Sequence, residues 1–172
     1  MNLPHQIGDT VLCYQITDIL GQGGIGITYA AKELPTANKV ALKVLSLQRM
    51  QDFKALDLFE REAKILSQLD HPSIPHYIDY FEIKSENNSC FYIVQEVANG
   101  KPLNTLIEEG WQPSEREAKK IAIQVLEILK YLQQLIPPVI HRDIKPENII
   151  YSNEGKVSLV DFGAVQDVYH QT

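Results

Sequence analysis

The densest group of chemically useful side chains lies in the stretch HRDIKPEN, residues 141–148. Asp143 can accept a proton from an attacking hydroxyl group. Lys145, two positions later, can neutralise the charge of a phosphoryl group during transfer. Asn148 offers a neutral oxygen, and hard oxygen ligands suit Mg²⁺. Because Pro146 breaks any helix, the stretch is not the solvated face of a helix, and we interpret it as a loop built for phosphoryl transfer.

A carboxylate that could share the metal ion with Asn148 follows shortly afterwards. Asp161 begins the tripeptide DFG. Two short apolar runs, NIIY and VSLV, lie between the loop and this tripeptide and read as strands. Paired with each other, these strands would hold Asn148 and Asp161 side by side, which predicts a magnesium site.

The segment GQGGIG, residues 21–26, has the spacing G-x-G-x-x-G through Gly21, Gly23 and Gly26. Glycines permit a tight loop whose amides approach phosphate oxygens, although the pattern alone is explained at least as well by a plain hairpin turn. A dinucleotide-binding fold would require a helix directly after the loop. Instead the β-type run ITYAA follows, so we expect a loop between two antiparallel strands that covers a ligand.

Lys43 lies in the run VALK between Leu42 and Val44. A single lysine on a strand is usually solvated, but a half-buried lysine requires an anion. Glu62 lies one turn before Leu66 on the apolar side of the following helical pattern, whereas Glu60 lies on a different side. The sequence therefore predicts an ion pair between Lys43 and Glu62.

The elements that must position these residues can be predicted from residue periodicity. Three closely linked strands over residues 12–20, 27–31 and 39–45 favour an antiparallel meander. A helix is predicted over residues 52–69, followed by strands over 77–83 and 90–97. A long helix begins after Ser114, an N-cap that forms a capping box with Glu117, and runs to about residue 135. The change from sheet to helix near residues 99–100 predicts a boundary between two lobes.

Composition limits the class of protein. The 172 residues carry a net charge of -6, which disfavours nucleic-acid binding as a main role. The two cysteines, Cys13 and Cys90, have no metal-ligand spacing and provide no disulfide framework, which fits a cytoplasmic compartment. No apolar run is long enough for a membrane span. We therefore expect a globular cytoplasmic domain.

Taken in order, GQGGIG, VALK, HRDIKPEN and DFG resemble the signature of the protein kinase family, and specifically the bacterial serine/threonine kinases of eukaryotic (Hanks) type. The resemblance runs from about residue 11 to residue 166. It implies an α+β, protein-kinase-like fold. Residues 1–98 would form an N-lobe with a five-stranded antiparallel sheet and one main helix, and residues 99–172 a partial, mainly α C-lobe.

The resemblance also implies ATP and Mg²⁺ as cofactors, a protein as substrate, and a role for each matching residue. Asp143 resembles the catalytic base, Lys145 the residue that neutralises the phosphoryl group, and Asn148 and Asp161 the magnesium ligands. Residues 95–98 resemble the hinge between the lobes. The expected nucleotide-binding residues are Gly21, Gly23, Gly26, Thr28, Ala41, Lys43, Glu62, Gln95, Glu96, Ala98 and Ile150.

The sequence departs from the family pattern after Gly163, where nine residues remain and the activation segment and later helices are absent. The resemblance then implies a chain truncated after the DFG motif. Three hypotheses stay open: a serine/threonine kinase domain that transfers the γ-phosphate of ATP to a protein hydroxyl, an ATP-binding pseudokinase fragment, and an interaction module that pairs with a separate partner chain. The apolar residues of the long helix are too many for one buried stripe, so we expect an exposed apolar patch there.

Overall fold

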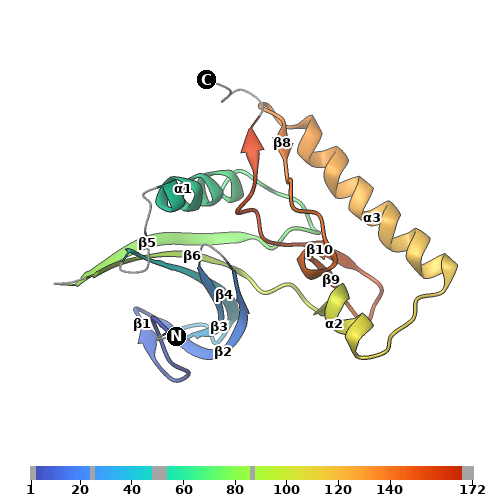
Figure 1. Ribbon diagram of the computed structural model, residues 1–172. Coiled ribbons are helices and arrows are strands. Elements are labelled where there is room, and N and C mark those ends of the chain that lie inside the picture. Colours follow the sequence, from blue (N-terminus) through green and yellow to red (C-terminus); the bar gives the residue numbers. More distant parts are fainter. Residues whose placement is uncertain (1–2, 24–25, 48–53, 86–87, 168–172) are drawn as a thin grey trace. The chain divides into compact units, whose positions relative to one another are not determined.

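The computed structural model describes residues 3–23, 26–47, 54–85 and 88–167 (Figure 1). The chain divides into two compact units. The first consists of Met1–Gln68 and His76–Val97, and the second of Leu69–Pro75 and Ala98–Thr172. The short excursion at Leu69–Pro75 belongs to the second unit, where the Leu159 N–H donates to the Ser73 carbonyl at 2.9 Å. Its contacts are long-range, so no local pattern in the sequence marks it.

The first unit is built on a six-stranded antiparallel sheet in the order β1-β2-β3-β4-β6-β5. The prediction of an antiparallel sheet is confirmed, but the predicted number of five strands is wrong. The additional strand is β1, which has only two residues and pairs with the start of β2, and so carries no periodic signal. The strands are β1 (Thr10–Val11), β2 (Tyr14–Gln22), β3 (Ile27–Glu33), β4 (Lys39–Ser46), β5 (Tyr77–Ser85) and β6 (Asn88–Glu96).

Strand β4 divides the sheet into two chemically different faces. Val40, Leu42 and Val44 are buried and join a core cluster with apolar side chains of β2, β3 and β6. Ala41 and Lys43 alternate with them and are half-buried. Since successive side chains of a strand point to opposite faces, Lys43 lies on the face away from this cluster.

Helix α1 (Lys54–Leu66) lies alongside β5 in the first unit (Figure 1). Its buried positions are Phe59, Glu62, Ala63, Ile65 and Leu66, so its inner face is apolar apart from one carboxylate. The predicted start of this helix, at residues 52–53, lies outside the described residues. A buried glutamate on such a face requires a cationic partner.

The described part of the second unit contains three helical segments and two small sheets. In one sheet the strands run in the order β10-β9-β7, and in the other β11 pairs with β8. The helical segments are α2 (Leu103–Glu108), α3 (Glu115–Gln134) and the 3₁₀ turn η2 (Pro146–Asn148). The strands are β7 (Lys101–Pro102), β8 (Val139–Ile140), β9 (Ile149–Tyr151), β10 (Val157–Leu159) and β11 (Gln166–Asp167).

The predicted N-terminal cap of α3 is confirmed. The Ser114 hydroxyl accepts from the Glu117 N–H, and the Glu117 carboxylate accepts from the Ser114 N–H at 2.8 Å. The helix buries one stripe, formed by Ile121, Val125, Ile128 and Leu132. Ile123 and Leu126 lie off this stripe with 55 % and 63 % of their surface exposed, so an apolar part of the helix faces solvent.

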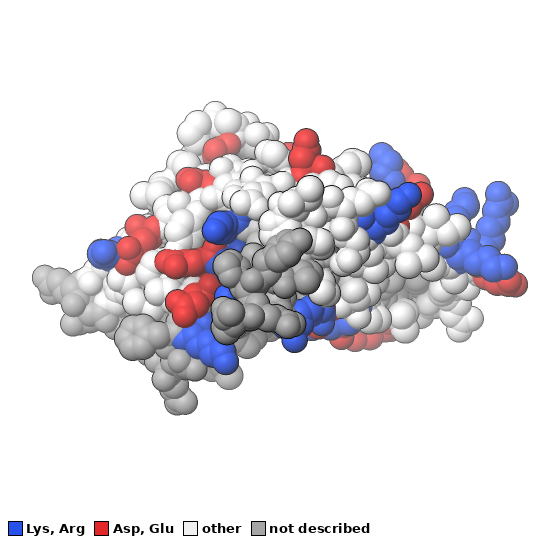
Figure 2. All heavy atoms as spheres, turned by 90° about the horizontal axis from the view of Figure 1, so that it is seen from above, with Lys and Arg blue, Asp and Glu red and all other residues white. Residues whose placement is uncertain are grey.

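Figure 2 shows Lys and Arg as well as Asp and Glu side chains in scattered groups on a mostly uncharged face. This mixture agrees with the modest net charge of -6. Among the described residues, none of the helices has the length and apolar character needed to cross a membrane.

Candidate active site

The predicted ion pair between Lys43 and Glu62 is confirmed. Lys43 Nζ lies 2.7 Å from Glu62 Oε1 and 2.8 Å from Glu62 Oε2, so the ammonium group contacts both oxygens of the carboxylate. Lys43 comes from β4 and Glu62 from α1. Glu62 is 1 % exposed and Lys43 16 % exposed. The ion pair fixes the position of the Lys43 ammonium group on the face of β4 that points away from the core cluster.

The glycine-rich segment connects β2 to β3, as predicted for a loop between antiparallel strands, and no helix follows it. The dinucleotide-binding alternative is therefore excluded. Gly23 N–H donates to the Gly26 carbonyl at 3.0 Å, which closes the turn. A Cβ added at Gly26 would come 2.4 Å from the Val44 carbonyl oxygen. Gly26 thus allows the loop to approach β4 next to Lys43.

Several of the predicted nucleotide-binding residues share the face of the sheet that carries Lys43. Thr28 on β3 is directly opposite Lys43, and Gln95 on β6 is directly opposite Ala41. Opposite residues of neighbouring strands lie on the same face. The backbone N–H of Glu96, in the segment predicted as the hinge, donates to the His76 carbonyl at 2.9 Å.

In the second unit the loop of residues 141–148, predicted to be catalytic, brings Asp143, Lys145 and Asn148 into direct contact. Lys145 Nζ lies 2.8 Å from Asp143 Oδ2. The Asn148 side-chain amide donates to both Oδ2 and the backbone carbonyl of Asp143, each at 2.9 Å. Lys145 and then Asn148 stabilise the charged carboxylate, which lowers the pKa of Asp143. Asp143 reciprocally raises the pKa of Lys145, so both groups are charged at neutral pH.

The residues predicted as metal ligands have suitable donor chemistry. The Asn148 amide nitrogen is committed to Asp143, so the side-chain oxygen is the atom that remains for a cation. Asp161 is exposed, and its Oδ1 accepts from the Gly163 N–H at 3.4 Å. Within the described ranges no group of three or more His, Cys, Asp or Glu could hold a metal ion. This pair of oxygen donors fits Mg²⁺ if phosphate and water oxygens complete the coordination.

His141 links the loop of residues 141–148 to the segment before Asp161 through hydrogen bonds. The Asp143 N–H donates to His141 Nδ1 at 3.3 Å, which places the ring proton on Nε2, where it donates to the Val160 carbonyl at 3.2 Å. The ring is fully buried and packs edge-on against Phe162, with centroids 4.7 Å apart. Burial lowers the pKa of His141, so the ring is neutral. The sequence alone did not reveal these hydrogen bonds.

The β9–β10 hairpin carries both predicted metal ligands at its open end. Ile149 pairs with Leu159, and the Val160 N–H donates to the Asn148 carbonyl at 3.0 Å. Ile150, predicted to contact the nucleotide, is buried on β9. At the closed end Gln124 of α3 donates to the Gly155 carbonyl at 3.1 Å and accepts from the Val157 N–H at 3.0 Å. A glutamine on a polar helix face gives no signal in the sequence, so this anchor was missed.

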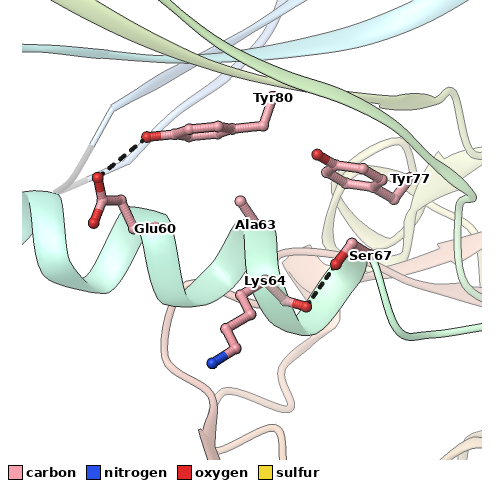
Figure 3. Close-up of a pocket in the computed structure, with 6 residues that line it drawn as sticks. All are labelled: Glu60, Ala63, Lys64, Ser67, Tyr77 and Tyr80. Carbon is pink, nitrogen blue, oxygen red and sulfur yellow. Dashed lines mark hydrogen bonds between the residues drawn. The ribbon is translucent and has the colours of Figure 1, made fainter.

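A separate pocket of about 260 Å³ lies between α1 and β5 (Figure 3). Its helical wall is formed by Glu60, Ala63, Lys64 and Ser67, which recur at the spacing of one helix face, and Tyr77 and Tyr80 form the opposite wall. Glu62 is not among the lining residues. The pocket is therefore distinct from the ion pair with Lys43.

Comparisons with known proteins agree with this geometry. Residues 14–172 match the protein kinase domain family. The chain is 37 % identical to serine/threonine-protein kinase B of Synechocystis sp. over 90 % of the chain and 27 % of the relative. It is 33 % identical to serine/threonine-protein kinase PrkC of Bacillus subtilis over 87 % of the chain and 22 % of the relative. The chain thus spans only about a quarter of the length of these relatives, and it belongs to the protein kinase family.

Proposed function

We propose that this chain carries the nucleotide-binding residues and the catalytic loop of a cytoplasmic serine/threonine protein kinase. The reaction would transfer the γ-phosphate of ATP to a serine or threonine hydroxyl of a protein. Two observations support the serine/threonine class. Relatives from Synechocystis sp. and from Bacillus subtilis carry that name, and Lys145 follows Asp143 by two positions, as in the serine/threonine branch of the family.

The observation that carries the proposal is the arrangement around Asp143. In the part of the chain that the structure describes, both side-chain contacts of Asp143 fall on Oδ2, which leaves Oδ1 to accept a hydrogen bond from a substrate hydroxyl. The lowered pKa keeps the carboxylate ionised. As the hydroxyl oxygen bonds to the γ-phosphorus and the bond to the β-phosphate oxygen breaks, Asp143 takes the hydroxyl proton. A protein that only binds nucleotide needs no such base.

The charged residues near the phosphates would act by position and electrostatics. Lys145 would exchange its contact with Asp143 for the phosphoryl group that is transferred. Lys43, held by Glu62, would contact the α- and β-phosphates. The amides around Gly21, Gly23 and Gly26 would cover the phosphates, and the adenine would lie against Thr28, Ala41, Gln95, Ile150 and the backbone of Glu96 and Ala98.

Asn148 and Asp161 would hold Mg²⁺ through one amide oxygen and one carboxylate. When bound, the ion neutralises phosphate charge. The protein's contribution is to orient the two donors: the amide group of Asn148 is fixed by its two bonds to Asp143. Asp161 follows directly after Val160, whose N–H is bound to the Asn148 carbonyl.

The proposal is tested with Asp143→Asn in the 172-residue chain. Transfer of labelled γ-phosphate to a generic protein substrate and binding of ATP with Mg²⁺ are measured in parallel. We expect the transfer rate to fall by roughly 10²–10⁴-fold, the usual contribution of a general base, with ATP binding retained. Glu147→Gln, an exposed change in the same loop, is the matched control and should leave the rate within about twofold of the unmodified chain.

The two arms of this experiment separate the candidate functions. Equal transfer by the Asp143→Asn variant and the unmodified chain would show that Asp143 is not the base. Binding of ATP and Mg²⁺ with no transfer even in the unmodified chain would instead favour the ATP-binding pseudokinase. Absence of both activities would favour an interaction module that needs a partner chain.

A further inference from the structure

Residues 3–9 precede the part of the chain that matches the kinase family, which begins at residue 14. They are nevertheless docked on the sheet of the first unit. Leu3 packs against the core cluster. The Gly8 N–H donates to the Ile16 carbonyl, and the Ile16 N–H donates to the Asp9 carbonyl, both at 2.9 Å. This segment is a specific extension of the fold, and we call residues 3–9 the clasp.

The centre of the clasp is His5, which lies over two buried tyrosines. The Tyr29 hydroxyl donates to the His5 carbonyl at 3.2 Å, and His5 Nε2 lies 2.8 Å from the Tyr92 hydroxyl. The His5 ring is 6.1 Å from the Tyr29 ring and 5.8 Å from the Tyr92 ring, measured between centroids. Tyr29 on β3 and Tyr92 on β6 are both fully buried. Buried hydroxyl groups require hydrogen-bond partners, and His5 supplies one to each of these tyrosines.

We propose that the clasp is a pH-sensitive element that is docked on the sheet while His5 is neutral and is released when His5 takes up a proton. The geometry gives the reason. The ring lies between aromatic side chains and a buried hydroxyl group rather than beside a carboxylate. A charged imidazolium would lose water there without gaining an ion pair.

The groups that face His5 do not offset the cost of burying a charged imidazolium. Among the described residues of the sheet, the titratable groups beside the His5 ring are the hydroxyls of Tyr29 and Tyr92, and the Cys90 thiol lies next to Tyr92. Burial raises the pKa of Tyr92, so this hydroxyl is neutral at any pH of interest. On the clasp itself the Asp9 carboxylate favours the charged ring, but it also accepts from the Gln6 N–H at 2.8 Å. Burial exceeds the effect of Asp9 and lowers the pKa of His5.

The direction of the pH dependence follows from this shift. A released His5 titrates near its ordinary pKa of 6.5, and the docked His5 titrates below that value. Docking is therefore fully stable above pH 6.5. It weakens by about tenfold for each pH unit below 6.5, because the released clasp binds one proton more, until the lowered pKa is reached.

Release would also affect the sheet beneath the clasp. Leu42 and Val44 belong to the same core cluster and flank Lys43 on β4. Any effect on nucleotide binding through Lys43 rests on the proposed function, whereas docking of the clasp does not. The test below therefore uses no nucleotide.

The experiment is amide hydrogen exchange on the 172-residue chain between pH 5 and 8, with rates expressed as protection factors. The reporters are the amides of Gly8 and Ile16, which donate the two backbone hydrogen bonds that join the clasp to β2. In the unmodified chain we expect their protection to fall below pH 6.5, by up to about tenfold per pH unit. In His5→Gln, which keeps a polar group but cannot be protonated, protection should be independent of pH. His76→Gln changes an exposed histidine of the same unit and should behave like the unmodified chain.

Two results would overturn the inference. One is protection of Gly8 and Ile16 that stays constant from pH 8 to pH 5 in the unmodified chain. The other is a decline of equal size in His5→Gln. If the clasp of the His5→Gln variant fails to dock, titration of the His5 ring by NMR in the unmodified chain provides an independent test. A pKa of 6.5 or above contradicts the proposal, and a pKa below 6.5 supports it.

Discussion

Lys43 and Glu62 form an ion pair whose two members are buried to different degrees: Glu62 is 1 % exposed, and Lys43 is 16 % exposed. Both carboxylate oxygens contact the ammonium group. Removal of Lys43 therefore leaves a buried anion, whereas removal of the charge of Glu62 leaves a cation with a route to solvent. Because losing an ion-pair partner costs a buried charge more than one that reaches solvent, we expect the two substitutions to be unequal.

We expect Lys43→Met to lower the free energy of unfolding by about 3 kcal/mol, at the lower end of the range for breaking a buried pair, and Glu62→Gln to lower it by less. Both should weaken binding of ATP with Mg²⁺, Lys43→Met by roughly 10- to 100-fold, the worth of a hydrogen bond to a charged group. Urea unfolding and calorimetry measure the two quantities. Unchanged ATP binding in Lys43→Met would show that Lys43 does not contact the phosphates.

The double variant Lys43→Met with Glu62→Gln separates stability from binding. It contains no unpaired charge, so its stability should recover part of the loss caused by Lys43→Met alone. Its affinity for ATP should not recover, because the ammonium group is still missing. Recovery of both quantities together would mean that the weak binding came from a damaged fold.

The close approach of Gly26 to Val44 predicts unequal effects for the three glycines of the loop. A methyl group at Gly26 would lie 2.4 Å from the Val44 carbonyl oxygen, which is part of β4 and cannot move alone. Gly26→Ala should therefore lower the free energy of unfolding by about 1–3 kcal/mol, the usual cost of overpacking.

Gly21→Ala and Gly23→Ala are the matched controls for this prediction. An added Cβ meets no atom within 4 Å at either position, so a change within about 0.5 kcal/mol is expected. Urea unfolding of the three variants gives the comparison. Equal stability of all three would show that the loop does not press against β4.

The fold was predictable where residue patterns are long and regular. The alternation in β4 and the capping box of Ser114 and Glu117 both identified their elements correctly. Two-residue strands such as β1, β8 and β11 escaped prediction because they contain no complete period and exist only through their partners. That Leu69–Pro75 belongs to the second unit could not be predicted either, because this assignment depends on contacts between residues distant in sequence.

The candidate site shows a similar division. Charged groups at a fixed spacing, such as Asp143, Lys145 and Asn148, could be singled out because their residue types already specify the chemistry. The side chains that support the loop and the hairpin around these groups could not be singled out from the sequence. Gln124 acts through hydrogen bonds to the β9–β10 hairpin, which folding brings near to α3, and a single glutamine looks like any other polar residue in a sequence.

The buried ring of His141 predicts that the second unit becomes less stable in mild acid. Burial lowers the pKa of His141, so the unfolded chain takes up a proton near pH 6.5 while the folded chain does not. The stability that depends on the neutral ring is fully present above pH 6.5 and is lost as the pH falls below it. For this one group we expect a slope of up to about 1.4 kcal/mol per pH unit.

His141→Phe tests this prediction because it keeps an aromatic ring against Phe162 and removes the titrating group. The variant should start from a lower stability, having lost the hydrogen bond to the Val160 carbonyl. Its free energy of unfolding should then decline less steeply between pH 6.5 and 5 than that of the unmodified chain. Identical slopes in urea unfolding would exclude His141 as a source of the acid sensitivity.

The outer side of α3 exposes two large apolar side chains. Ile123 and Leu126, three positions apart on one helix face, are 55 % and 63 % exposed, although the opposite stripe of the same helix is buried. Neighbouring exposed apolar side chains bind hydrophobic dyes and favour association. We expect the 172-residue chain to bind such a dye and to self-associate in sedimentation experiments. It should retain binding of ATP but phosphorylate a generic protein substrate very poorly.

Substitution of both exposed residues tests whether this face is responsible. Ile123→Lys together with Leu126→Lys should reduce dye fluorescence and shift the chain towards the monomer, with little change in stability because neither side chain is buried. Gln133→Lys, an exposed polar position on the same helix, adds charge without removing apolar surface and should change neither quantity. If the unmodified chain is a monomer that binds no dye and phosphorylates protein rapidly, the exposed face of α3 has no role in association and does not limit catalysis by Asp143.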